Sequence, residues 1–194
     1  MLTELLQEYQ IILASGSPRR QQFFKDLNLS FKVAVPNVEE IYPEHLKKEE
    51  ITDFLALLKA DAFDNLQKNE ILITSDTIVW HQDNAVGKPK DMDEAKNMLR
   101  SFSGNAHEVV SSVCIRVGKR EKLINQVTKV FFKELSEKEI DYYITNYQPL
   151  DKAGAYGIQE WLGLIAITKI EGNFYNVMGL PVQLLYKTLI DMVK

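Results

Sequence analysis

One short polar stretch near the start of the sequence combines residue types that could bind a phosphate. The stretch is Ser15–Arg20, which follows an apolar run and opens a helical pattern. Free N–H groups and the positive end of the helix dipole make such a helix start suitable for an anion. Two arginines in a first turn, Arg19 and Arg20, are unfavourable for the helix itself, which indicates a functional reason for them. The alternative is a capped helix whose arginines are only solvated.

Two single charged residues are further candidates for chemistry. Asp76 follows the apolar run 71–74, and the carboxyl ends of strands border the ligand crevice in open α/β sheets. A carboxylate there could bind a metal ion or act as a base, although an ordinary turn aspartate would give the same pattern. Lys88 lies between Gly87 and Pro89 and would suit a phosphate, the alternative being a solvated loop lysine.

A fourth candidate is the segment Asp151–Gln159, in which small residues follow a charged pair. Two glycines and two alanines come after Asp151 and Lys152. Core packing alone does not explain these small residues, and glycine allows the backbone to approach a ligand closely. The alternative is a surface salt bridge beside a tight turn.

The elements that must position these candidates alternate between strand and helix patterns in the first half of the chain. Apolar patterns predict strands at residues 10–14, 31–35, 71–74, 78–80, 108–117, 123–132 and 164–170. They predict helices from 18, at 49–66, at 91–102, at 136–146 and from 181. Ser17 is a typical N-cap, and Ser136 with Glu139 is typical of a capping box. This order, with one hairpin in the middle, predicts an α/β fold with a mixed sheet.

Length, composition and charge exclude several classes of protein. The 194 residues, 45% of them apolar, suffice for one large domain or two lobes. The net charge of -4 argues against a nucleic-acid partner, which usually needs a basic face. The single cysteine, Cys114, excludes an internal disulfide and a thiolate metal cage. The sequence shows no signal-peptide pattern and no apolar run long enough to cross a membrane, so we expect a cytoplasmic protein without a membrane partner.

The candidate segments together resemble the motifs of the Maf family of nucleoside triphosphate pyrophosphatases. The matches occur in the family's order at residues 13–20, 75–79, 87–89, 98–107, 151–159 and 177–181, and they span nearly the whole chain. Asp151–Gln159 and the Arg19-Arg20 pair are similar to the branch that acts on dTTP and UTP. The resemblance implies hydrolysis of these nucleotides, or of modified pyrimidine nucleotides, to the nucleoside monophosphate and pyrophosphate, as house-cleaning of the nucleotide pool.

The resemblance also implies a fold, a cofactor and an assembly. The fold is an elongated mixed sheet with flanking helices and two lobes around a cleft, similar to the inosine triphosphate pyrophosphatases (Maf/Ham1-like). Residues 1–194 would form a single domain with two lobes. The cofactor is a divalent metal cation, Mg²⁺ or Mn²⁺, and the assembly is a homodimer.

The resemblance assigns roles to individual residues of this chain. Asp76 corresponds to the catalytic acidic residue and, together with Glu40, to the metal-binding positions. The substrate-binding positions include the charged pair at the start of Asp151–Gln159. They are Ser15, Arg19, Arg20, Lys59, Thr77, Lys88, Asp151, Lys152 and Gln159. Thr77, Gln159 and one arginine of the pair correspond to specificity positions. Neutral hydrogen-bonding groups such as those of Thr77 and Gln159 suit the polar edge of a pyrimidine.

Two other functions are compatible with the sequence. One is a nucleotide-binding regulator of septum formation and cell division with little turnover, and the other is a pyrophosphatase for modified purine triphosphates. Intact Asp76, Lys88 and Lys152 favour a catalyst over a regulator.

Overall fold

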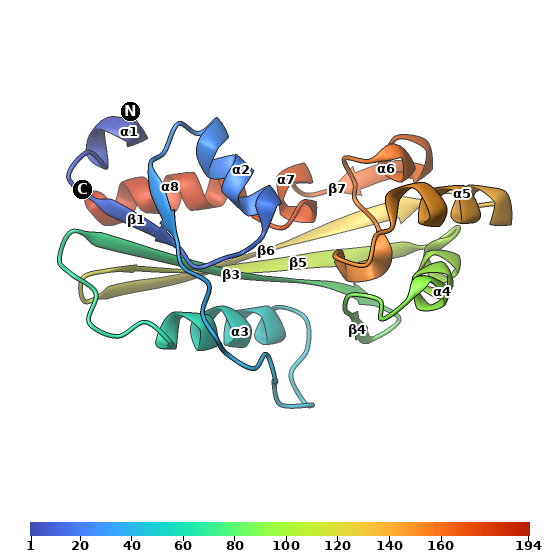
Figure 1. Cartoon of the computed structure of the whole chain (residues 1–194), viewed down its shortest axis with the longest axis horizontal. Helices are drawn as coiled ribbons and strands as arrows, with labels where there is room; N and C mark the ends of the chain where they lie inside the picture. Colours follow the sequence, from blue (N-terminus) through green and yellow to red (C-terminus); the bar gives the residue numbers. More distant parts are fainter. The chain divides into compact units, whose positions relative to one another are not determined.

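The computed structural model describes residues 1–194, which form two compact units (Figure 1). Unit 1 comprises Met1–Asp76, Ser111–Gln126 and Gly179–Lys194. Unit 2 comprises Thr77–Val110 and Val127–Met178. The resemblance implies a single domain with two lobes, and this organisation stays a prediction. No helix in the structure has both the length and the apolar character that crossing a membrane requires.

Seven strands form one mixed sheet, with hydrogen-bonded neighbours in the order β2-β1-β3-β5-β6-β7 and β4 on β3. Their bounds are β1 Gln10–Leu13, β2 Phe31–Val33, β3 Glu70–His81, β4 Asn84–Val86, β5 Ala106–Val117, β6 Arg120–Phe132 and β7 Ile167–Glu171. β1 is parallel to both β2 and β3, whereas β4 is antiparallel to β3 and β7 is antiparallel to β6. The predicted α/β fold with a mixed sheet is therefore confirmed.

Unit 1 places helices on both sides of its strands. These helices are α1 (Leu2–Leu5), α2 (Pro18–Asp26), α3 (Glu49–Asp61) and α8 (Val182–Val193), with α3 on one side and α2 and α8 on the other (Figure 1). α2 begins as predicted, because Ser17 Oγ accepts a hydrogen bond from the N–H of Arg20. On α3, the small residues Ala56 and Ala60 pack in a core cluster with Leu72 of β3, so the helix approaches the strand closely.

Unit 2 has four α-helices and one 3₁₀ helix, and three of its α-helices, α4, α5 and α7, begin with a side-chain cap. The elements are α4 (Met92–Phe102), α5 (Glu137–Tyr147), the 3₁₀ helix η1 (Ala153–Ala155), α6 (Trp161–Ala166) and α7 (Phe174–Val177). The carboxylate of Asp91 accepts a hydrogen bond from the N–H of Glu94 at 2.8 Å, which caps α4. The predicted capping box of Ser136 and Glu139 starts α5. Leu99, Phe102 and Tyr143 fill the core of this unit.

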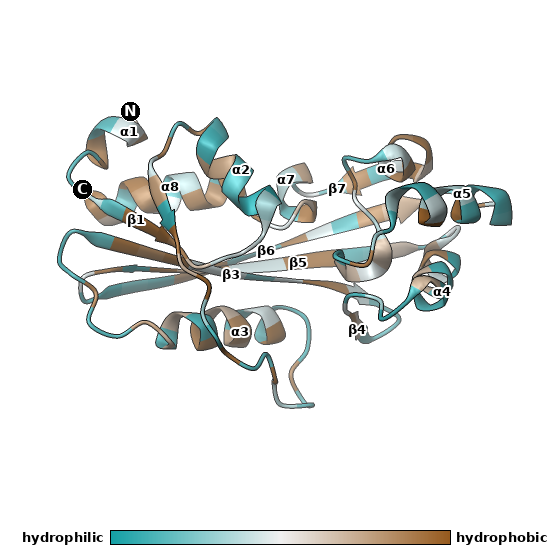
Figure 2. Ribbon diagram, viewed as in Figure 1, coloured by the Kyte–Doolittle hydropathy of each residue, from teal (hydrophilic) through white to brown (hydrophobic).

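The distribution of apolar residues explains which faces are buried. Figure 2 shows β1 as largely hydrophobic and α3 as carrying both hydrophobic and hydrophilic residues. On α3 the buried residues include Ile51 and Leu55, four positions apart, which is the spacing of one helical face. On β3 nearly every residue is buried, because neighbours cover both faces of this strand.

The strand predictions at 71–74 and 78–80 were wrong in one respect, because both belong to the continuous strand β3. The polar residues Ser75, Asp76 and Thr77 suggest a break between two strands, yet the strand runs through them. Ser75 is 1% exposed and Asp76 is 6% exposed. Asp76 therefore lies inside a buried strand rather than in a turn after it.

Two further predicted boundaries differ from the structure. Residues 164–166 belong to α6 rather than to a strand, and only residues from Ile167 onward form β7. The buried residues Leu162 and Ala166 are four positions apart, which is helical spacing. The helix predicted at 49–66 ends at Asp61, and Asn65 has a φ of 60°, which a continuing right-handed helix excludes. The hairpin and the other long helices are confirmed.

The start of α6 depends on a glycine, which gives a testable prediction. A Cβ atom at Gly163 would lie 1.8 Å from the backbone oxygen of Ile158, so the backbone would have to shift. We expect Gly163→Ala to lower the free energy of unfolding by about 1–3 kcal/mol, measured by urea denaturation. Gly87→Ala is the control, because a Cβ there meets nothing within 4 Å. Equal changes in both variants would contradict this account of α6.

Candidate active site

The polar residues of unit 1 gather where β1 ends. The last residue of β1, Leu13, pairs with Ile73 of β3, and the chain then turns away into Ser15 and the start of α2. Asp76 lies further along β3, beyond this last pair. Because β1 no longer pairs with this part of β3, side chains from other elements can reach it. The carboxyl end that borders the candidate site is thus that of β1.

A buried ion pair joins α3 to β3. Lys59 Nζ lies 2.7 Å from Asp76 Oδ1 and 3.0 Å from Glu40 Oε2. Lys59 is 8% exposed, and Asp76 is similarly buried. A buried charge is unfavourable unless it is paired, so each of these two groups depends on the other. The side chain of Glu40 is 53% exposed, which makes it the solvent-facing member of the group.

Arg20 connects three segments of unit 1 through its guanidinium group. Its Nε donates to the carbonyl oxygen of Gly179 at 2.8 Å. Its Nη1 donates to the carbonyl oxygen of Ser75 at 2.9 Å and to Ser15 Oγ at 3.3 Å. Burial lowers the pKa of Arg20, and the nearby charge of Asp76 raises it. The structure therefore brings Arg20 together with the predicted residue Ser15 and places it beside the Asp76 segment.

The remaining predicted residue of unit 1 is Arg19, which follows Pro18 in the first turn of α2 and is half-buried. It is one of the charges that act on the pKa of Arg20, and it lowers that pKa by repulsion. Two cations at one helix start make this end of α2 positive. An anion would be favoured there by both side chains and by the helix dipole.

In unit 2 the structure brings two of the predicted segments side by side. The N–H of Gly154 donates to the carbonyl oxygen of Gly87 at 3.0 Å, which links the segment of Lys152 to the segment of Lys88. Gly154 has a φ of +71°, and a Cβ atom there would lie 3.1 Å from side-chain atoms of both Phe102 and Val79. Only glycine combines this left-handed conformation with such a close approach.

The predicted side chains of unit 2 differ in exposure. Lys152 is 8% exposed and lies 2.7 Å from Asp151 Oδ1, whereas the side chain of Asp151 is 61% exposed. Lys88 and Gln159 are exposed, and Thr77, which follows Asp76 in β3, is half-buried. The exposed groups are therefore accessible to a ligand, and Lys152 is held in place by an acidic neighbour.

Sequence reasoning missed two polar residues of unit 2 that contact the predicted ones. Glu160 Oε1 lies 3.2 Å from Lys152 Nζ, and the same carboxylate accepts a hydrogen bond from the phenol of Tyr143. Tyr143 lies on α5, and no local pattern distinguishes it from an ordinary core aromatic residue. The position of Glu160 directly after Gln159 was the one available signal.

Two acidic residues of unit 1 have the chemistry of a donor set for a divalent cation. No group of three or more His, Cys, Asp or Glu side chains in the structure could hold a metal ion. The pair predicted to bind metal, Glu40 and Asp76, is held together by one ammonium group, that of Lys59. Mg²⁺ is usually bound by one or two carboxylates, with water and phosphate oxygens completing its shell. Two carboxylate side chains are thus a suitable donor set.

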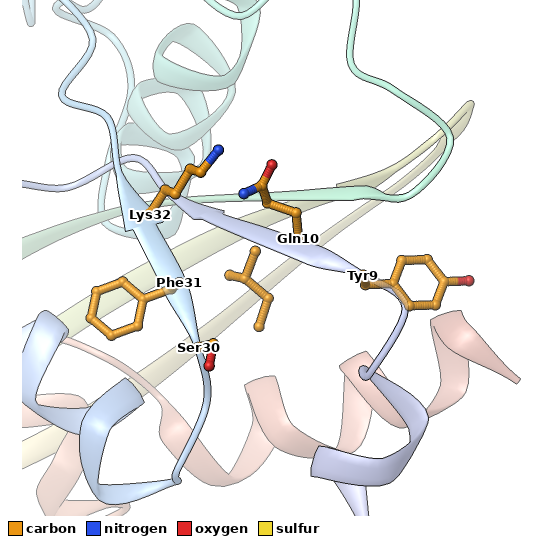
Figure 3. A pocket seen from close by; sticks show the side chains of 6 residues that line it. Tyr9, Gln10, Ser30, Phe31 and Lys32 are labelled. Carbon is orange, nitrogen blue, oxygen red and sulfur yellow. The ribbon is translucent and has the colours of Figure 1, made fainter.

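A hollow of about 270 Å³ lies elsewhere in unit 1, along β1 and β2 (Figure 3). Its lining residues are Tyr9, Gln10, Ile11, Ser30, Phe31 and Lys32. Gln10 and Lys32 extend from neighbouring strands, and the Tyr9 ring lies at the beginning of β1 (Figure 3). None of the predicted site residues lines this hollow, so the sequence motifs do not point to it.

The sequence comparisons with known proteins agree on one family. A family model described as "Maf-like protein" matches residues 10–192. The dTTP/UTP pyrophosphatase of Flavobacterium johnsoniae is 59% identical over 194 residues, and the match covers 100% of both chains. That of Bacteroides fragilis is 47% identical over 186 residues, covering 95% of this chain and 96% of the relative. The Ham1 protein of Staphylococcus aureus shares the fold, with a TM-score of 0.52 and 17% identity over 94% of this chain and 99% of that one.

His107, one of two buried histidines of unit 2, gives a prediction about stability and pH. His107 Nε2 lies 2.7 Å from the hydroxyl of Tyr156, and burial, with repulsion from His81, lowers the pKa of His107 to about 3. An unfolded histidine gains its proton near pH 6.5, so the folded state loses stability as the pH falls from about 6.5 toward 3. The loss that this residue causes between pH 7 and pH 5 is about 2 kcal/mol.

We expect His107→Gln to remove this part of the pH dependence, measured as the free energy of unfolding in urea at several pH values. The control is His45→Gln, because His45 is an exposed histidine. If the free energy of unfolding falls as steeply with pH in His107→Gln as in the wild-type protein, His107 does not cause the loss of stability.

Proposed function

Because the chain belongs to the Maf-like protein family, we propose that it is a nucleoside triphosphate pyrophosphatase that hydrolyses dTTP and UTP. The products are the nucleoside monophosphate and pyrophosphate. The observation that carries this proposal is the identity of 47–59% over nearly the full length with relatives named dTTP/UTP pyrophosphatase. The buried charge cluster around Asp76 supports it, since the motif residues of unit 1 meet there.

The cationic residues are proposed to bind the phosphates. A triphosphate repels an incoming nucleophile through its negative charge, so cations that neutralise this charge lower the barrier. In unit 1 the groups are Arg19, Arg20 and Lys59, with the hydroxyl of Ser15 as a hydrogen-bonding neighbour. In unit 2 they are Lys88 and Lys152, the latter oriented by Asp151. Guanidinium and ammonium groups both bind phosphate oxygens, arginine through a planar fork and lysine as a point charge.

Asp76 is proposed to position a water molecule and to accept its proton. The water oxygen forms a bond to the α-phosphorus, the bond from that phosphorus to the pyrophosphate oxygen breaks, and the proton passes to the carboxylate. The ammonium group of Lys59 lies 2.7 Å from Asp76 Oδ1, so it holds the carboxylate in place besides binding phosphate.

Glu40 and Asp76 are proposed to hold a divalent cation, Mg²⁺ or Mn²⁺. Such an ion, when bound, neutralises phosphate charge and acts as a Lewis acid. The residues of the chain itself orient the nucleotide, and Glu40, on the solvent-facing side of the cluster, can reach an ion without leaving Lys59 unpaired. We further propose house-cleaning of the cytoplasmic nucleotide pool and a homodimer, as the resemblance implies.

The first prediction for this function concerns Asp76. We expect Asp76→Asn to lower kcat by about 10²- to 10⁴-fold, because the amide retains the shape of the side chain but accepts no proton at neutral pH. The measurement is pyrophosphate release from dTTP with saturating Mg²⁺, together with the melting temperature as a check of folding. Asp141→Asn is the matched control, because Asp141 forms a surface ion pair with Lys96. Retention of most of the parent rate in Asp76→Asn would exclude the proposed role.

The second prediction concerns the base. The amide of Gln159 can both donate and accept a hydrogen bond, so it can match the O4 acceptor and the N3–H donor that uracil and thymine share. We expect dTTP and UTP to be hydrolysed well and dATP and dGTP poorly, in a panel read as pyrophosphate release. Gln159→Glu is expected to lower kcat/KM for dTTP and UTP by about tenfold or more, because a donor is lost.

The control for Gln159→Glu is Gln7→Glu, since Gln7 is exposed and lies outside every motif. Metal dependence is expected to be unchanged in both variants. Purine triphosphates as the best substrates would contradict the base preference while leaving the pyrophosphatase chemistry intact. Binding of nucleotide without turnover of any member of the panel would instead favour a regulator.

A further inference from the structure

Glu160 is an acidic residue that the proposed mechanism does not use, and its carboxylate has two partners. One oxygen, Oε1, lies 3.2 Å from Lys152 Nζ, and the other, Oε2, accepts a hydrogen bond from the phenol of Tyr143. The side chains of Lys152 and Glu160 are 10% and 20% exposed. Lys152 and Glu160 are thus both held away from solvent. An ionic contact is strong in such surroundings, and the loss of one of its two members is costly.

The hydrogen bonds continue from Glu160 back to the backbone of the same segment. The hydroxyl of Tyr143 accepts a hydrogen bond from the N–H of Gly157 at 2.9 Å while it donates to Glu160. Burial raises the pKa of Tyr143, which keeps the phenol protonated and able to donate. The chain of contacts therefore connects the beginning of the segment at Lys152 with its end at Glu160.

Gly157 leaves the space that the carboxylate occupies. A Cβ atom at this position would lie 2.7 Å from Glu160 Cδ and 3.0 Å from each of its carboxylate oxygens. Any side chain at residue 157 would therefore displace Glu160. The backbone at Gly157, the phenol of Tyr143 and the carboxylate of Glu160 are thus packed against one another as one built unit.

We propose that Glu160 is a positioning residue for nucleotide binding, which acts through Lys152 and through the backbone that carries Gln159. This inference rests on the proposed function. The Lys152 ammonium group donates a hydrogen bond to Asp151 Oδ1 at 2.7 Å and lies 3.2 Å from Glu160 Oε1, so two carboxylates hold its position. An ammonium group has three N–H donors, so Lys152 keeps donors for a phosphate oxygen of the nucleotide. The side chain of Asp151 is 61% exposed and that of Glu160 is 20% exposed, so Glu160 is the carboxylate less screened by solvent, and Tyr143 holds it in place.

The test compares Glu160→Gln with the wild-type protein in pyrophosphate release from dTTP. The amide oxygen of the variant can still accept from Tyr143, but its charge toward Lys152 is lost. We expect KM to rise on the order of tenfold, with kcat much less affected, because Lys152 then contacts the phosphates less well. A merely structural effect would lower the amount of active protein, and hence kcat, while KM stayed the same.

A double-mutant cycle shows whether Glu160 acts through Lys152. In a Lys152→Met background, Glu160→Gln is expected to cause no further rise in KM, whereas independent roles would give multiplied effects. Tyr143→Phe serves as a second variant, which breaks the link to Gly157 without changing a charge and is expected to raise KM as well. Glu137→Gln is the matched control, because Glu137 forms an exposed ion pair with Arg100.

The outcomes separate this inference from the function on which it rests. A wild-type protein that releases no pyrophosphate from any nucleoside triphosphate would overturn the proposed function. An active wild-type protein with an unchanged KM in both Glu160→Gln and Tyr143→Phe would overturn only the role of Glu160. Multiplied effects in the cycle would likewise overturn the pathway through Lys152.

Discussion

A carboxylate buried in the middle of a strand requires a partner, and this requirement organises unit 1. Asp76 lies in β3 with the ammonium of Lys59 at 2.7 Å, so α3 must present Lys59 toward that strand. The hydroxyl of Thr74 donates to the carbonyl oxygen of Ala56 at 2.6 Å and fixes the same helix against β3. The carbonyl oxygen of Ser75 accepts from Arg20 and connects α2. Three consecutive residues of one strand thus each hold a neighbouring element.

Buried polar groups in unit 2 also need partners, and the unit satisfies this need in two ways. The buried ammonium group of Lys152 is paired with carboxylates on two sides. In the aromatic core of the unit, burial lowers the pKa of His107 and raises that of Tyr156, so this hydrogen-bonded pair is neutral near pH 7. Ionic groups therefore lie near the segment Asp151–Gln159, whereas the His107–Tyr156 pair in the packed interior is neutral. This division is what a site for an anionic nucleotide needs, because a charge outside the core can meet the ligand.

Local sequence patterns determined much of the fold and the membership of the family. The cap at Ser17 and the capping box at Ser136 marked helix starts correctly, because caps depend on residues within one turn. The hairpin of β5 and β6 followed from two apolar runs around a turn. The motifs that identify the family are likewise contiguous segments, so their order along the chain could be read without a structure.

Contacts between distant residues were decided only by the tertiary structure. The polar run from Ser75 to Thr77 suggests a turn, but strand pairing and buried partners keep it within β3. The apolar run 161–166 fits a strand or a helix equally well, and packing on one face made it a helix. The link from Lys152 through Glu160 to Tyr143 joins α5 to a later segment, and no local pattern encodes it. Sequence patterns report interactions within a few residues, whereas partners for buried charges are chosen by the folded chain as a whole.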